Sequence, residues 1–209
     1  MGLFDFLNSK KTTSPVSPVL PEQVYKAVQS YLGCLHRESP TITLPDKISF
    51  MEKEATFYGE SLEQVLKEIN FYQLLYGRVG ICVDIRKDSK GLARPYIVLY
   101  PPEKVTNWGV TDIEDGNIPS YSFVVIDESG EKLNEAGEWI PVKQYRVLEM
   151  LNNVYVNGVF QNESYTPALM KPLSTQSGTF NKIPFVFCNV KDMKPKVQKP
   201  PLLGLANLC

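Results

Sequence analysis

Residues 61 to 76 have the apolar pattern of a helix that buries one face. Apolar side chains recur there at steps of three and four residues, which align them along one side of a helix: Leu62, Val65, Leu66, Ile69, Tyr72 and Leu75. The Ser61 hydroxyl can cap the first turn while Gln64 reaches back to the Ser61 amide, which is a capping box. Gly77 can end the helix in a left-handed conformation. Both ends of this helix are therefore predicted.

Two apolar stretches after this helix predict a β-hairpin. Residues 79 to 85 are rich in β-branched and apolar side chains, residues 87 to 91 are polar, and residues 96 to 100 are apolar again. Pro101 and Pro102 end the second strand, because neither residue has an amide hydrogen to donate. The pattern thus predicts a helix that leads into a two-stranded hairpin.

Packing of the helix against the hairpin would bury its apolar face. Leu66 and Ile69 are then expected to be nearly fully buried, and replacing Leu66 by alanine is expected to cost ~2–5 kcal/mol. Trp108 is expected at the edge of the same unit, where it would anchor the exit from the hairpin.

The chain before residue 61 is predicted to hold an apolar arm and further helices. Residues 2 to 7 can form one amphipathic turn that docks on a neighbour or remains a frayed terminus. Its apolar members are Leu3, Phe4, Phe6 and Leu7. Residues 8 to 20 are rich in Ser, Thr, Lys and Pro, which is typical of a linker. Residues 21 to about 36 have a helical apolar face after a Pro-Glu start, and an extended piece at 42 to 44 and a short helix at 48 to 55 are expected next.

The second half of the chain has the pattern of antiparallel strands separated by turns. The strand candidates are residues 121 to 126, 144 to 151, 154 to 160 and 183 to 190. Residues 109 to 120 are acidic and rich in turn formers, so a loop is predicted there. Residues 191 to 201 are rich in Lys and Pro, and residues 202 to 208 begin a helix that stops with the sequence at Cys209.

These elements predict an α+β fold, in which N-terminal helices pack on a mixed or antiparallel sheet and a mainly antiparallel β region follows. Four parts are expected: a flexible arm at 1–20, a helical and hairpin unit at 21–108, a mainly antiparallel β region at 109–190, and a linker with the start of a truncated helix at 191–209.

Composition is that of a folded protein without a strong overall charge. The 209 residues include 43% apolar and 11% aromatic side chains, which is ample for a packed core. The formal net charge of −1 gives no global field that would attract nucleic acid or an anionic membrane. No stretch approaches the ~18 apolar residues of a membrane helix, and the start lacks the features of a signal peptide. A protein made in the cytosol, with no membrane partner, is predicted.

Cysteine and histidine offer little for metal or redox chemistry. Cys34, Cys82, Cys188 and Cys209 lie far apart and form no C-x-x-C pair, so reduced and mostly buried thiols are predicted. His36 lies at a helix end without an evident nucleophile or orienting partner, and a surface role is predicted for it.

Acidic and aromatic residues are likewise interpreted as structural. Asp84, in an apolar strand, is interpreted as an ion-pair partner of Arg78 or Arg86. The acidic residues at 112 to 116 lack the ligand spacing of a calcium loop. Aromatic residues on the strands could stack on single-stranded nucleic acid, but a buried core is favoured because Lys and Arg are not interleaved with them. The sequence has no phosphate loop, nucleophile elbow, zinc-protease or kinase motif. It therefore predicts no catalytic, cofactor or metal site, and leaves nucleic-acid-binding residues unknown.

Several pieces in consistent order resemble the phage and prophage family labelled DUF4055, whose members look like portal proteins of tailed phages. The pieces are LYGRVGI at 75–81, ARPY at 93–96, VTNW at 105–108, QYRVL at 144–148, KIPFVF at 182–187 and PPLLGLA at 200–206. The resemblance covers about residues 22 to 208, and the MGLFD start is also similar to that of many portal proteins. Such proteins continue into long channel-lining helices, so this chain would correspond to the N-terminal half of one.

The resemblance implies a structural, non-enzymatic virion protein. Portal proteins form rings, commonly dodecamers, through which double-stranded DNA is packaged and ejected, while a separate terminase hydrolyses ATP. Implied partners are further copies of the chain, terminase, capsid or scaffold proteins and head-to-tail connector proteins. The implied location is the host cytoplasm during assembly and then the virion.

Two other classes of function remain open from the residues alone. One is a small α+β module of phage origin that binds a protein or ligand without catalysis. The other is a phage-encoded enzyme whose site is too dispersed to recognise. A terminase gene just upstream and a scaffold gene downstream would favour the portal.

Overall fold

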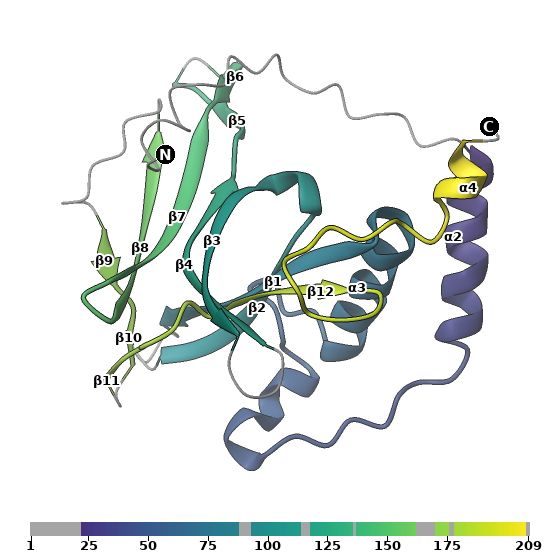
Figure 1. The fold of residues 1–209 in the computed structure, drawn as a ribbon, viewed down its shortest axis with the longest axis horizontal. Coiled ribbons are helices and arrows are strands. Elements are labelled where there is room, and N and C mark those ends of the chain that lie inside the picture. Colours follow the sequence, from purple (N-terminus) through teal and green to yellow (C-terminus); the bar gives the residue numbers. More distant parts are fainter. Residues whose placement is uncertain are drawn as a thin grey trace. The chain divides into compact units, whose positions relative to one another are not determined.

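The computed structural model describes residues 22–87, 93–113, 118–135, 137–161, 170–175 and 178–207 (Figure 1). The chain has an α+β fold, with helices toward the N-terminus and a β-rich region after them, as the sequence predicts. Three predicted segments lie outside the described residues: the N-terminal residues 1 to 20, the polar turn after residue 87 and the acidic residues at 114 to 117.

Five helical segments occur along the described chain. They are α2 (Glu22–Leu35), the 3₁₀ helix η1 (Asp46–Glu52), α3 (Leu62–Tyr76), the 3₁₀ helix η2 (Pro102–Lys104) and α4 (Leu203–Ala206). The short helix expected at 48 to 55 is the 3₁₀ turn η1, while residues 42 to 44 have no regular secondary structure. None of the helices in the described ranges is long and apolar enough to cross a membrane.

The strands form antiparallel sheets. They are β1 (Arg78–Lys87), β2 (Ala93–Tyr100), β3 (Val105–Ile113), β4 (Pro119–Asp127), β5 (Gly130–Leu133), β6 (Trp139–Val142), β7 (Gln144–Leu151), β8 (Val154–Gln161), β9 (Lys171–Pro172), β10 (Ser174–Thr175), β11 (Gly178–Thr179) and β12 (Phe185–Asn189). Their orders are β12-β1-β2, β3-β4-β7-β8-β9, β5-β6 and β10-β11.

Helix α3 begins and ends where its capping residues predict. The Ser61 hydroxyl accepts a hydrogen bond from the Gln64 amide at 3.2 Å, and the Gln64 side-chain oxygen accepts one from the Ser61 amide at 2.7 Å. Gly77 follows with a left-handed φ of 82°. The capping box and the glycine cap are both confirmed, so local chemistry defines this helix before any packing.

The sheet of β1 and β2 has a third strand, β12, whose pairing the local pattern does not indicate. Strand β12 pairs antiparallel with β1, and Phe187 lies opposite Gly80. The predicted strand at 183 to 190 is therefore real, but it belongs to the hairpin sheet and not to the preceding antiparallel strands. Its partner lies more than 100 residues away in the chain, so no short-range signal could indicate this pairing.

Helix α3 packs on this sheet, although the depth of its side chains differs from the expectation. It contacts β1 and β12, as a helix on a sheet. Val65 is 1% exposed and packs with Met51 and Ala55. Leu66 and Ile69 are only partly buried, so the expected near-complete burial is wrong. Met51 and Ala55, in and just after η1, pack against Val65, so Val65 and not its neighbour Leu66 is the most buried residue of the helix.

The five-stranded sheet has its own apolar core. Val125, Val147 and Val156 are buried there together with Phe160 and Met170. These side chains come from β4, β7 and β8 and from the residue before β9. The strands predicted at 121 to 126, 144 to 151 and 154 to 160 are thus confirmed as neighbours in one antiparallel sheet.

Strand β3 occupies sequence that was expected to be a hairpin exit and a loop. Residues 109 to 113 continue β3, which pairs beside β4. Trp108 lies within β3, and so in the five-stranded sheet and not at the edge of the hairpin unit. Polar residues such as Thr111 suggested a loop, but an edge strand tolerates polar side chains because one side faces solvent.

Contacts divide the described chain into two compact units. One contains Lys104–Val110 and Tyr121–Ile183, and the other contains Leu20–Glu103, Thr111–Ser120 and Pro184–Cys209. Strand β12 belongs to the second of these units because it pairs with β1.

Candidate functional site

Strands β5 and β6, here called the arm, carry apolar side chains in solvent. The two strands form a two-stranded antiparallel sheet in which Leu133 lies opposite Trp139 and Lys132 lies opposite Ile140. The exposed fractions are 50% for Leu133, 67% for Trp139 and 43% for Ile140. A two-stranded hairpin gains little stability by itself, so these side chains are not explained by folding of the arm.

The alternation of side chains gives the arm two different faces. Because neighbouring residues of a strand point to opposite sides, Leu133 and Trp139 share one face with Glu131 and Pro141. We call this the tryptophan face. Pro141 also has no amide hydrogen, which makes the β6 edge a poor template for another strand. The arm therefore offers a face, more than an edge, for contact.

The tip of the arm is ordered by its own polar groups. Asn134 donates its amide to the Glu138 carbonyl at 2.9 Å, and the Glu138 amide donates to the Asn134 side-chain oxygen at 2.8 Å. Gly137 takes a left-handed φ of 81°, and its amide donates to the Asn134 carbonyl. This turn holds Leu133 and Trp139 opposite each other without help from a core.

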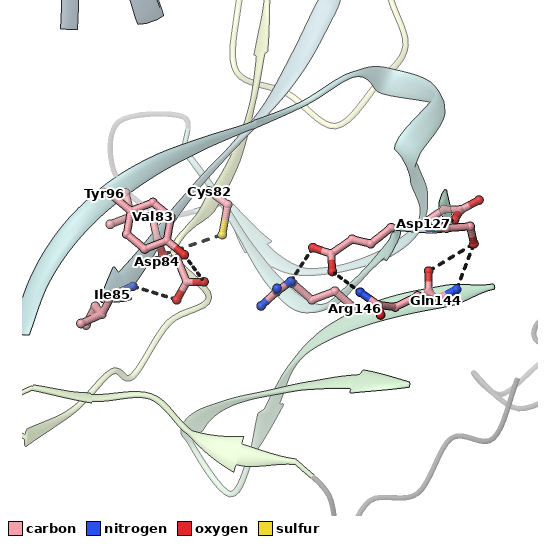
Figure 2. Close-up of polar contacts among 10 residues, drawn as sticks. Cys82, Val83, Asp84, Ile85, Tyr96, Asp127, Gln144 and Arg146 are labelled. Atoms are coloured by element: carbon pink, nitrogen blue, oxygen red, sulfur yellow. Dashed lines mark hydrogen bonds and ion pairs between the residues drawn. The ribbon is translucent and has the colours of Figure 1, made fainter. Parts of the chain in front are cut away.

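A half-buried ion pair lies at the root of the arm (Figure 2). Arg146 Nε lies 2.6 Å from Glu128 Oε1, and the two side chains are 24% and 18% exposed. Gln144 Nε2 donates to the other oxygen, Glu128 Oε2, at 3.3 Å. A charged pair with this low exposure holds its geometry more firmly than a surface pair does.

Backbone and hydroxyl contacts complete the root. The Ser129 hydroxyl accepts a hydrogen bond from the Gln144 amide at 3.0 Å, and the Ser129 amide donates to Asp127 Oδ1 at 2.8 Å. The Glu128 amide donates to the Gln144 carbonyl at 2.9 Å. These bonds join the end of β4 to the start of β7, so the direction in which the arm leaves this strand pair is fixed.

Asp84 belongs to a separate polar cluster on the hairpin of β1 and β2 (Figure 2). Its Oδ2 accepts a hydrogen bond from the Tyr96 hydroxyl at 3.0 Å, and its Oδ1 accepts one from the Ile85 amide at 2.7 Å. Tyr96 is the residue directly across the hairpin from Asp84. The contacts described for this carboxylate thus hold two strands together.

The two arginines proposed as partners for Asp84 make other contacts. Arg86 donates to the Phe57 carbonyl at 2.6 Å and lies over the Phe57 ring. Arg78 is 5% exposed, donates to the Pro195 carbonyl at 3.2 Å and lies 4.2 Å from the centre of the Phe187 ring. Both guanidinium groups therefore help to pack apolar and backbone groups.

His36 has a structural contact and lies partly buried. Its Nε2 accepts a hydrogen bond from Asn70 Nδ2 at 2.9 Å, which joins the end of α2 to α3. The prediction of a surface histidine is therefore only half right. No nucleophile is brought to this ring by the contacts described.

The cysteines and acidic residues give no metal site within the described ranges. No group of three or more His, Cys, Asp or Glu side chains is close enough there to hold a metal ion. Cys82 is buried, Cys188 is half-buried and Cys34 is exposed, so the expectation of mostly buried thiols fails for Cys34. Burial raises the pKa of the Cys188 thiol. Cys209 lies outside the described residues.

Helix α3 carries a tyrosine with a strongly shifted pKa. Burial first, and then the Glu68 carboxylate, raise the pKa of Tyr72 to about 12. Burial and the nearby Glu60 also raise the pKa of Glu68. The pKa shift is larger for Tyr72, which is half-buried, and its hydroxyl is therefore less easily ionised than that of an exposed tyrosine.

Several aromatic residues on the strands are core residues, as expected, while others such as Tyr96 and Tyr145 are half-buried. Tyr155, Phe160, Phe185 and Phe187 are each at most 4% exposed, so they cannot act as stacking platforms for a nucleic acid. Trp139 is the contrast, because it lies on a strand and remains in solvent.

Sequence reasoning missed the arm. A Trp-Ile pair preceded by Asn and Gly residues is a usable hairpin signal, but Pro141 and the charges of β5 argue against a strand. Comparison with models of known protein families and with curated proteins gives no match to this chain.

Proposed function

We propose that this chain is a structural virion protein, the N-terminal part of a portal-like subunit of a tailed phage or prophage. With further copies of itself it would form the ring through which double-stranded DNA is packaged and ejected. Its action would be mechanical and would need no cofactor. The ring would dock terminase, capsid or scaffold proteins and connector proteins.

The observation that carries the proposal is the arm. Trp139 and Leu133 are held in solvent by an ordered turn and a half-buried ion pair, although they add nothing to a core of their own. Aromatic and aliphatic side chains held in this way are typical of residues that become buried against a protein partner. A subunit of a symmetric ring requires such surfaces.

Two further features favour a structural role. The residues that could have carried acid–base chemistry, His36 and Asp84, make hydrogen bonds that join neighbouring elements. The net charge of −1 suits a conduit, because a channel that bound phosphates tightly would hold the DNA in place. The resemblance of the pieces from residue 75 to residue 206 supports the portal-like part of the proposal.

Light scattering after size exclusion tests the proposal. The 209-residue chain is expected to be a monomer or a polydisperse weak oligomer, because the channel helices would supply much of the contact between subunits. A chimera in which the channel helices of a protein from the resembled family follow residue 202 is expected to form closed rings of one mass. A chimera that remains a compact monomer would overturn the portal proposal and favour the non-catalytic binding module.

A further inference from the structure

The tryptophan face of the arm has a chemical counterpart at the start of the chain. Residues 3 to 7 contain Leu3, Phe4, Phe6 and Leu7, a short stretch with one acidic residue. We call this stretch the hook. Residues 8 to 20, which are rich in Ser, Thr, Lys and Pro, connect it along the chain to the region of α2.

We propose that the hook of one copy of this chain docks on the tryptophan face of the arm of a second copy. This inference rests on the proposed function, since it names the segment that joins neighbouring subunits. The contact would bury the apolar side chains of the hook against Leu133, Trp139 and Pro141.

Apolar chemistry is the first argument for this pair of surfaces. Trp139 and Leu133 form one continuous apolar strip because they lie directly opposite each other on the two strands. A large aromatic ring that is 67% exposed loses the most water when it is covered. The hook offers two phenylalanines and two leucines in five residues, which matches a strip of this kind.

Charge is the second argument. The arm and its turn contain Glu131, Glu135 and Glu138 against a single basic residue, Lys132. Lys10 and Lys11 follow the hook after two polar residues, and Asp5 is the only acidic residue from position 1 to position 11. Residues 1 to 11 together therefore have a net charge opposite to that of the arm, which favours their encounter.

Reach is the third argument. The 13 residues from Asn8 to Leu20 can span up to about 45 Å when extended, at about 3.5 Å for each residue. A tether of this length can cross from one subunit to the next. Head-to-tail rings need two different surfaces on each subunit, and the hook and the arm supply one each.

Pairing of two arms through their edges is the main competing contact, and the sequence disfavours it. A symmetric antiparallel pairing centred on either of the two middle residues of β5 would place Glu131 opposite Glu131 or Lys132 opposite Lys132. Like charges directly opposite each other destabilise a strand pair. The β6 edge has Pro141, which cannot donate to a neighbouring strand. The face of the arm is left as the surface for association.

The fluorescence of Trp139 tests the docking directly. The chain has two tryptophans, so the variant Trp108→Phe leaves Trp139 as the reporter. Adding a synthetic peptide of residues 1 to 11 to this full-length variant is expected to shift the emission to the blue with saturation. The same peptide with serine at positions 3, 4, 6 and 7 is expected to give no shift, and Leu133→Ser in the protein is expected to weaken binding at least tenfold.

Two controls decide between the remaining outcomes. The variant Trp139→Phe keeps Trp108 and is expected to show no shift with the peptide, and circular dichroism checks that Leu133→Ser is folded. In dilute solution the full-length reporter is expected to have the same emission as its version with serine at positions 3, 4, 6 and 7. A difference there would mean that the hook docks within its own chain and would overturn docking between copies.

Failure of this inference is distinct from failure of the proposed function. Absence of a shift, or an equal shift with the serine peptide, overturns the docking whether or not the chimera forms rings. A saturable shift together with a chimera that stays monomeric would support the docking of the hook and overturn the portal proposal.

Discussion

Two hairpins of the chain, β1 with β2 and β5 with β6, have the same antiparallel topology but differ in what covers them. In the first, β1 and β2 join β12 in a sheet on which α3 packs, and Val79 and Cys82 are at most 3% exposed. In the second, β5 and β6 pair with each other, and Leu133 and Trp139 remain at least half exposed. Formation of a hairpin therefore does not by itself bury apolar side chains. In the first hairpin the further elements α3 and β12 bury them, whereas β5 and β6 pair only with each other.

The difference separates stability from recognition. Side chains of the first hairpin sheet gain their free energy when the chain folds, so their removal should weaken folding. The apolar side chains of the arm can gain theirs only when a partner arrives, so their removal should leave folding nearly unchanged.

The largest effect is expected from Phe187→Ala in the first sheet. Phe187 is fully buried opposite Gly80, with the Arg78 guanidinium against its ring. Its loss should lower the free energy of unfolding by ~3–5 kcal/mol, measured by denaturant titration. The matched change Leu133→Ala in the arm should cost less than ~0.5 kcal/mol, as surface substitutions do. Equal losses at the two positions would contradict the contrast.

A smaller effect is expected from Gly77→Ala, where the chain enters the first hairpin. Gly77 and Gly59 both have a left-handed φ, at 82° and 85°. A side chain at Gly77 would meet the Gln198 carbonyl at 3.0 Å and Pro200 at 3.3 Å, while one at Gly59 would meet nothing within 4 Å. Gly59→Ala should cost about 1–2 kcal/mol from backbone strain, and Gly77→Ala should cost about 1–3 kcal/mol more from overpacking. Equal costs would mean that residues 198 to 200 do not pack on the helix end.

The smallest effect is expected in the alkaline range, from the helix that covers the first hairpin. The folded pKa of Tyr72, about 12, lies above the ordinary value of 10.0. The folded chain therefore holds this proton more tightly, so the contribution is fully present below pH 10 and is lost as the pH rises through about 12. Tyr72→Phe should reduce the fall in unfolding free energy between these pH values. The ultraviolet absorbance of tyrosinate should show one fewer late-titrating group, and an unchanged titration would contradict the assignment.

Local chemistry made helix α3, which precedes the first hairpin, predictable from the sequence. Ser61, Gln64 and Gly77 determine both ends of α3 without reference to the rest of the fold, and their roles are confirmed. The burial order along the helix was not readable in this way. Val65, and not Leu66, is most buried because the segment that holds Met51 packs beside it, and no pattern within the helix indicates that neighbour.

Long-range pairing and exposed strands explain the other misses. The pairing of β12 with β1 depends on contacts between distant residues, and Trp108 became part of β3 because β4 supplies a partner strand. Strands β5 and β6 lack the longer apolar runs that indicate the other strands, because β5 is charged and Pro141 interrupts β6. Its turn, with Asn134 and Gly137, was the available signal. The candidate interaction site was therefore the part of the molecule least visible in the sequence, since its apolar side chains do not serve the fold.

The most direct test of the central claim is ring assembly by the channel-helix chimera with and without the arm side chains. Light scattering after size exclusion should give closed rings for the chimera, and monomers or irregular small oligomers for the chimera with Trp139→Ala and Leu133→Ala. Denaturant titration should give the two proteins the same free energy of unfolding within ~1 kcal/mol. Closed rings of unchanged mass and yield from the double variant would contradict the assignment of the arm as the surface through which copies of this chain assemble.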